Sequence, residues 1–192
     1  MKSLFVIISC LVILLTPEIT FGQKTSFSIG GEIALPGSSS GLSMNAGTGF
    51  GGSLRVESSW SKHISGLATI GYLAFAQTHP FSTTPTTTSK VKAILIQAGL
   101  KYYPREKKES PKGFFISAEL GFMPTTTHFT YAGNPDLNFK ETGISCAPGI
   151  GYQLGNIESS FRIQYNLTAS GFNVYYYNFR LAYSFLKRKD KN

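Results

Sequence analysis

Side chains alternate between apolar and polar in long runs through most of this sequence. Successive side chains of a β-strand point to opposite faces, so a period of two predicts strands with one apolar face each. The clearest run is the last, whose apolar phase consists of Tyr175, Tyr177, Phe179, Leu181, Tyr183 and Phe185. Its other phase consists of Asn178, Arg180, Ala182 and Ser184. No stretch after residue 23 keeps a helical period, so the sequence predicts an all-β fold.

Eight such runs follow residue 23, each near the ~10 residues that a tilted strand needs to cross a bilayer. The third and sixth runs, at about 64–77 and 142–153, mix small and apolar residues in both phases, so their phases stay open. The links alternate in length, with longer polar links at 36–46, 78–90 and 125–141 and tighter links at 60–63 and 154–156. Outer-membrane barrels have short turns on one side and longer loops on the other. We therefore expect an eight-stranded antiparallel up-and-down transmembrane β-barrel.

The polar phase indicates which face of the barrel lies inside. A soluble barrel of the lipocalin type has a wet outer face, which would be dense in Lys, Glu, Asp and Arg. Here that phase is mostly Gly, Ser, Ala, Asn and Gln, with isolated charges of both signs. Such residues fit the narrow lumen of an eight-stranded barrel. The apolar phase is then the lipid face, with aromatic girdles near the strand ends formed by Tyr102, Tyr103, Tyr152, Tyr175 and Tyr183.

The charged residues of the polar phase form the candidate functional set. They are Glu32, Arg55, Glu57, Lys101, Glu119, Glu158, Arg162 and Arg180. They could line a narrow polar pore or gate, or they could form a plug of salt bridges, since buried charges must pair. We favour the plug, because eight strands leave little lumen.

The chain divides into three segments. Residues 1–22 have the layout of a secretory signal peptide, with Lys2, an apolar run from Leu4 to Leu15 and small residues up to a cleavage position near Gly22. That run is shorter than the ~20 apolar residues of a transmembrane helix. We expect residues 23–186 to form the barrel and residues 187–192 to be a basic tail.

Charge and cysteine content limit the partners. The net charge is +8, but an exported protein does not meet nucleic acid, so contact with anionic lipid head groups or polysaccharide is expected instead. Cys146 is the one cysteine outside the expected signal peptide, which excludes an internal disulfide and a cysteine-based metal site.

Several short motifs connect the chain to a known family. They are the pairs Gly71-Tyr72 and Gly151-Tyr152, the segment Ala98-Gly99-Leu100-Lys101-Tyr102-Tyr103 and the closing Tyr183-Ser184-Phe185. With the signal peptide, these motifs resemble the small porin-like outer-membrane β-barrel domain family over about residues 24–186. The resemblance implies a Gram-negative outer-membrane location, a monomer, and lipid and lipopolysaccharide as surroundings. It also implies that Phe185 is the terminal aromatic read by the barrel-insertion machinery, although residues 186–192 follow it.

Motifs that could carry chemistry are weak. Residues 47–52 match the G-x-G-x-x-G spacing of dinucleotide sites, but they lead into a strand where that motif needs a helix. His63, His79 and His128 lie in three separate links, which does not favour a metal site. A lipid A hydrolase could use a His-x-Ser or His-x-Thr pair, at His63-Ile64-Ser65 or at His128-Phe129-Thr130 with Glu141 orienting the base. We expect no catalytic residues, cofactor or metal.

Three functions remain in order of preference. The first is a non-enzymatic outer-membrane barrel that stabilises the envelope or displays the segments 78–90 and 125–141 to external ligands or surfaces. The second is a small channel for ions or modest solutes, and the third is the lipid A hydrolase.

Overall fold

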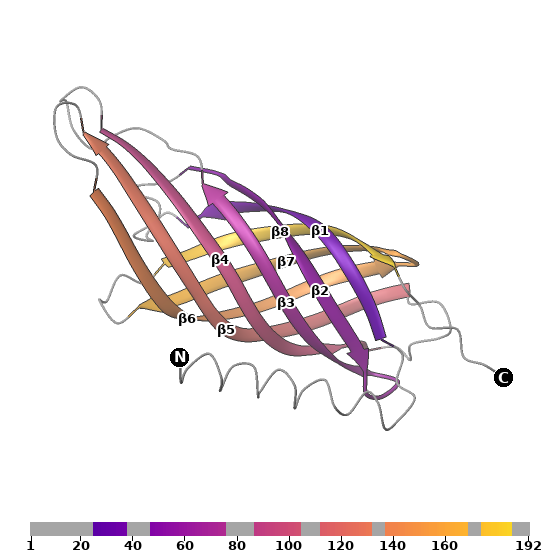
Figure 1. Ribbon diagram of the computed structural model, residues 1–192. Coiled ribbons are helices and arrows are strands. Elements are labelled where there is room, and N and C mark those ends of the chain that lie inside the picture. Colours follow the sequence, from indigo (N-terminus) through magenta and orange to yellow (C-terminus); the bar gives the residue numbers. More distant parts are fainter. Residues whose placement is uncertain are drawn as a thin grey trace.

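The computed structural model describes residues 25–37, 47–75, 87–104, 112–131, 137–168 and 174–185. They contain eight strands: β1 (Thr25–Pro36), β2 (Gly49–Ser59), β3 (Ile64–Phe75), β4 (Thr87–Tyr102), β5 (Lys112–Tyr131), β6 (Leu137–Leu154), β7 (Ile157–Thr168) and β8 (Val174–Phe185). Each strand pairs with the next, and β8 pairs antiparallel with β1, which closes the barrel (Figure 1). The predicted fold class is confirmed. The predicted signal peptide at 1–22 and basic tail at 187–192 lie outside the described residues.

Within the residue ranges given above, no helix is both long and apolar enough to cross a bilayer.

The two ends of the barrel differ. At one end, called here the terminal end, β1 begins and β8 finishes, and the tight links after β2 and β6 lie there. At the opposite end, called the extended end, β4, β5 and β6 rise beyond the other strands, as Figure 1 shows at the upper left. These three strands have 16, 20 and 18 residues, against 11 or 12 in each of the others.

Burial alternates along the strands with the predicted phase. On β8, Leu181 is 63 % exposed and its neighbour Arg180 is 1 % exposed. The same contrast holds on β1, where Ile29 and Ile33 point outward and Glu32 points into the lumen. In water this surface would expose apolar side chains around the whole barrel, whereas in hydrocarbon it matches its surroundings and every paired strand satisfies its backbone. The barrel is therefore a transmembrane barrel with its apolar face outward.

The aromatic girdles form at both ends, with one exception. Exposed or half-buried aromatic side chains gather on the outer face near the terminal end (Trp60, Tyr102, Phe114, Tyr152, Tyr183 and Phe185) and near the extended end (Phe50, Tyr165, Tyr175 and Tyr177). The prediction for Tyr103 was wrong: this ring is 3 % exposed and lies inside the barrel. Tyr103 follows the last residue of β4 and keeps the inward phase of Lys101, so its hydroxyl reaches polar partners in the lumen.

The prediction of a long loop at 125–141 was also wrong. β5 continues through this segment to Tyr131 and β6 begins at Leu137, so most of it is a hairpin. Above the apolar belt both faces of a sheet can be polar, and the alternation that marks a strand disappears. We call this sheet the extension; it comprises residues 87–92, 125–131 and 137–142. At its base the β4–β5 ladder lacks register pairs between Ala93–Thr125 and Ile96–Phe122, beside Pro124, which has no N–H to donate.

A lysine substituted in the apolar belt tests the orientation of the barrel. Leu181→Lys should lower the free energy of unfolding by about 2–4 kcal/mol, because it places a cation near the middle of the hydrocarbon. The matched substitution Leu35→Lys, close to the extended end of β1, should cost only about 0–1 kcal/mol. Denaturant titration in lipid vesicles, followed by the fluorescence of the single tryptophan, measures both. Equal costs at the two positions would contradict the assignment of the lipid face.

Candidate functional site: the filled lumen

The structure places all eight charged residues of the candidate set in the lumen. Each is at most 6 % exposed, and they come from six of the eight strands. Each occupies the inward phase of its strand, so the period of two alone turns it toward the barrel axis. The ring closure then brings together residues that are far apart in sequence, such as Arg55 and Glu158.

Arg55 of β2 lies at the centre of the network. Its guanidinium donates to Glu119 Oε1 at 2.7 Å and to Glu158 Oε1 at 2.8 Å, which joins β2 to β5 and β7 across the lumen. Its remaining nitrogen, Nε, donates to Thr69 Oγ1 on β3 at 3.1 Å, and the Thr69 hydroxyl donates to Glu119 Oε2 at 2.7 Å. The planar fork of arginine suits this arrangement, because its donors point in fixed and different directions.

A second part of the network crosses the junction between β8 and β1. Arg162 of β7 donates to Glu32 Oε1 at 2.9 Å and to Glu119 Oε1 at 3.1 Å. Asn178 of β8 donates to the other oxygen of Glu32 at 2.7 Å. Arg180 of β8 donates to Glu158 at 3.0 Å and to two serine hydroxyls, Ser28 on β1 and Ser53 on β2. Glu32 and the guanidinium groups of Arg162 and Arg180 therefore have several partners each.

The third part lies toward the terminal end. Lys101 Nζ of β4 is 2.6 Å from Glu158 Oε2 and 2.9 Å from Glu57 Oε2. It also lies 4.1 Å from the centre of the Phe115 ring, within the range of a cation–π contact. The Tyr103 hydroxyl is 2.8 Å from Gln153 Oε1 and 3.2 Å from Glu57 Oε1. These contacts close the network over the terminal end of the lumen.

The network is electrically balanced. Four glutamates face three arginines and one lysine, so its formal charge is zero. A buried charge is tolerated only when it is paired and its remaining hydrogen-bonding groups are satisfied. Here every one of the eight has an ion-pair partner among the others. The geometry is that of a cross-linked plug that fills the lumen from wall to wall.

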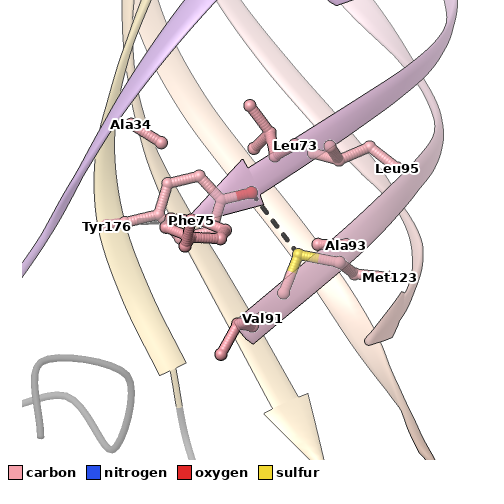
Figure 2. Packing of buried hydrophobic residues seen from close by; sticks show 8 residues of the cluster. All are labelled: Ala34, Leu73, Phe75, Val91, Ala93, Leu95, Met123 and Tyr176. Atoms are coloured by element: carbon pink, nitrogen blue, oxygen red, sulfur yellow. Dashed lines mark hydrogen bonds between the residues drawn. The ribbon is translucent and has the colours of Figure 1, made fainter. Parts of the chain in front are cut away.

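An apolar cluster fills the lumen between this network and the extended end. Figure 2 shows its members, Ala34, Leu73, Phe75, Val91, Ala93, Leu95, Met123 and Tyr176, all at most 5 % exposed. The rings of Phe75 and Tyr176 pack edge to face with centroids 5.5 Å apart, and the Tyr176 hydroxyl lies 3.4 Å from Met123 Sδ. Between the two layers, Gln97 and Gln164 donate to the hydroxyl of Ser145. We call the eight residues of Figure 2 the apolar cap.

Sequence reasoning missed the apolar cap, although it left a signal. Alternation fails on β4, where the inward residues Val91, Ala93 and Leu95 are as apolar as the outward Ile94 and Ile96. A strand that is apolar in both phases has both faces buried or covered. Here one face meets lipid and the other meets the apolar cap.

The residues considered for catalysis do not come together. His128 pairs across the ladder with Lys90 and Asn138 on the outer face of the extension, while Glu141 pairs with Thr125 on the opposite face. At the other candidate pair, His63 Nδ1 lies 2.8 Å from the carbonyl oxygen of Tyr103, and Ser65 is turned into the lumen. Within the described residues no three His, Cys, Asp or Glu side chains form a group that could hold a metal, and His79 is not among those residues.

The fold defines the class of protein: an eight-stranded transmembrane β-barrel with a filled polar lumen. No family model and no curated protein sequence matches the chain. Solved structures do match it. Ail, the attachment invasion locus protein of Yersinia pestis, matches with a TM-score of 0.60 and 14 % identity over 85 % of this chain and 99 % of that one. OprG from Pseudomonas aeruginosa matches with a TM-score of 0.53 and 11 % identity over 85 % and 96 %.

Neisserial surface protein A matches with a TM-score of 0.50 and 17 % identity, over 83 % of this chain and 97 % of that chain. The chain thus spans almost the whole of each of these barrels. At such identities the likeness establishes the fold alone, and that fold is the one of the eight-stranded outer-membrane β-barrels, as the sequence resemblance implied.

Breaking the network should destabilise the barrel. Glu119→Gln removes the carboxylate shared by Arg55 and Arg162 and leaves the lumen with an excess positive charge, so we expect a loss of about 3–5 kcal/mol in the free energy of unfolding. Adding Arg162→Met restores neutrality, and the double variant should lose less than the sum of the two single variants. Glu141→Gln, at an exposed glutamate of the extension, is the control. Strictly additive costs would show that the network does not act as a unit.

Proposed function

We propose that this protein is a non-enzymatic barrel of the outer membrane whose closed lumen serves as a rigid anchor for the extension. The observation that carries the proposal is the filled lumen, where a neutral ion-pair network and the apolar cap lie in series along the axis. A wall-to-wall plug makes a stiff cylinder and leaves the outer surfaces as the parts that meet other molecules. In this proposal the protein stabilises the envelope and presents the extension to the outside.

Several observations support an outer-membrane location. The apolar belt, the two girdles and the fold shared with Ail and OprG all belong to barrels that sit in lipid. With eight strands, both chain ends fall on one side, which we assign to the periplasm, so the extended end faces outward. The signal peptide at 1–22, cleaved near Gly22, provides export. Phe185 ends β8 on the outer face and is 44 % exposed, which suits a terminal aromatic read by the insertion machinery.

The channel alternative is disfavoured by the same lumen. An ion moving along the axis would have to break the pairs of Arg55 with Glu119 and Glu158 and then cross the apolar cap. The first step separates buried charges and the second step removes the hydration of the ion, so both are costly. Enzymatic activity on lipid A is disfavoured because His128 and Glu141 lie on opposite faces of the extension.

A role at the surface fits the extension. It is a three-stranded sheet that continues the barrel wall, so a partner meets a preformed surface with little cost of ordering. The similar barrel Ail is described as an attachment invasion locus protein, and one of its crystal structures holds the heparin analogue sucrose octasulfate. We propose by analogy that this chain also contacts anionic material at its outer side.

Fractionation of cells tests the location. We expect the protein to separate with the outer membrane, and to migrate faster on a denaturing gel before boiling than after it, because a closed barrel stays folded in detergent. A Gly99→Val variant is a suitable folding-defective control, because a Cβ at Gly99 would clash with the carbonyl oxygen of Ala118 in the adjacent strand. Recovery of the wild-type protein in a soluble fraction without detergent would refute the proposal.

Planar-bilayer recording tests the closed lumen. Wild-type protein that shows the heat-dependent gel shift should give no conductance steps. The variant Glu119→Ala with Arg180→Ala removes one charge of each sign from the network, and it should also stay silent because the apolar cap remains. Reproducible steps in the wild type that change in this variant would establish the channel instead.

A further inference from the structure

A shallow and largely open groove lies in the apolar belt over β1 to β4. Its volume is about 570 Å³, and its outward lining side chains are Ile29, Leu54, Ile70, Tyr72 and Ile94. The floor is formed at Gly52, which faces outward and has no side chain to fill the space between Leu54 and Tyr72. Gly52 pairs with Gly31 on β1, another outward glycine, so the hollow widens toward β1.

The surface between the groove and the extended end carries small and basic side chains on β3 and β4. The next outward residue above Tyr72 on β3 is Ala74, whose methyl group is short, and Ala74 pairs with Phe50 on one side and Lys92 on the other. On β4 the next outward residue above Ile94 is the same Lys92. A molecule that lies in the groove and extends one outward position beyond Tyr72 and Ile94 therefore meets a cation where the apolar belt ends.

That cation belongs to two rows on the outer face of the extension, which we call the lysine rows. The lower row is Lys92, Thr126 and Lys140, and the upper row is Lys90, His128 and Asn138. Strands lie about 4.8 Å apart, so Lys92 and Lys140 stand on either side of Thr126 roughly 10 Å from each other. Their flexible side chains span that distance to a common anion.

Among the described residues, no acidic side chain lies on the outer face beside the lysine rows. The three lysines are exposed, and none of them makes a salt bridge within the described residues. The outward positions beside them on β5 and β6 hold Pro124, Thr126 and Thr142, and the acid next to Lys140, Glu141, faces the other side of the sheet. The described part of this surface therefore carries cations and neutral polar groups, and it lies directly above apolar side chains.

We infer that the groove and the lysine rows together bind one phosphorylated, multiply acylated glycolipid of the outer leaflet, of the lipid A type. This inference rests on the proposed outer-membrane location. An acyl chain lies along the groove, because an apolar hollow in the hydrocarbon of the bilayer is filled by lipid and not by water. A phosphate group lies between Lys92 and Lys140, with the Thr126 hydroxyl as a further donor. The upper row, with Lys90 and His128, faces a second anionic group of the same head group.

The width of the basic surface favours a glycolipid over a phospholipid. Two rows across three strands offer cations at several positions, whereas a phosphatidylglycerol head group carries a single phosphate. A disaccharide head group with more than one phosphate matches both rows at once, and several binding groups on one molecule reinforce each other. Phosphatidylglycerol is thus the competing occupant that the experiment must separate.

Native mass spectrometry of the full-length mature barrel in detergent micelles tests the inference. Bisphosphorylated lipid A, the same lipid without phosphates, and phosphatidylglycerol are titrated separately. Wild-type protein should bind the bisphosphorylated lipid most tightly. Lys92→Ala with Lys140→Ala should weaken that binding about 30-fold, and Lys92→Arg with Lys140→Arg should restore most of it. Lys62→Ala, in the turn at the terminal end, is the charge control and should change nothing.

The groove is tested separately. Gly52→Leu fills the hollow, and its Cβ would lie 3.2 Å from the Gly30 carbonyl oxygen, which requires only a small adjustment. It should weaken binding of lipid A both with and without its phosphates. Ala118→Leu, which adds similar bulk to the lipid face of β5, should not.

Equal affinity for phosphatidylglycerol, or unchanged affinity in the double alanine variant or in Gly52→Leu, would overturn the inference. Because each variant is first checked for the heat-dependent gel shift and outer-membrane recovery, these results leave the proposed function intact. Loss of those two properties in the wild type refutes the proposed function instead.

Discussion

The buried ion-pair network is the constraint on which the rest of this barrel depends. A chain in lipid must place its polar side chains inside, and inside an eight-stranded barrel there is little room for water to solvate them. Each charge then requires a protein partner, as Arg55 finds in Glu119 and Glu158. These partners exist only when all the strands are in one register. A slip of one residue on β2 would turn Arg55 into the hydrocarbon and remove one cationic partner from each of the two carboxylates.

The two ends of the lumen are filled by different kinds of interaction. Toward the terminal end, charges and hydrogen bonds join opposite walls; toward the extended end, Phe75, Met123 and Tyr176 fill the space by packing. On the lipid face, burial of apolar side chains contributes no hydrophobic free energy, because the lipid tails are equally apolar. The wall is therefore stabilised by backbone pairing and by the contacts inside the lumen. The extension begins where this internal filling stops, and the β4–β5–β6 sheet there is supported by its own ladders.

The sequence was most informative where one face of a strand met lipid and the other met polar partners. On β8 and β7 that contrast is strongest, and both the strands and the inward charges Arg162 and Arg180 could be predicted from it. It fails on β3 and β4, whose inward residues include Leu73 and Leu95, because the apolar cap makes both phases apolar. It fails again in the extension, where both phases are polar. Which Glu pairs with which Arg could not be predicted, because those partners meet only through the closure of the ring.

The contacts between β8 and the first two strands have a consequence for assembly. Arg180, from the last strand to be made, finds Ser28 on β1 and Ser53 on β2, and Asn178 finds Glu32. Until β8 pairs with β1, Arg180 keeps Glu158 on the neighbouring strand β7 but lacks both serines, and Glu32 lacks Arg162 and Asn178. An acid buried without its cation is costly. Pairing of β1 with β8 and completion of the lumen network therefore occur together. A sheet that has not yet closed gains little stabilisation from these contacts, and the closed barrel resists separation of β1 from β8.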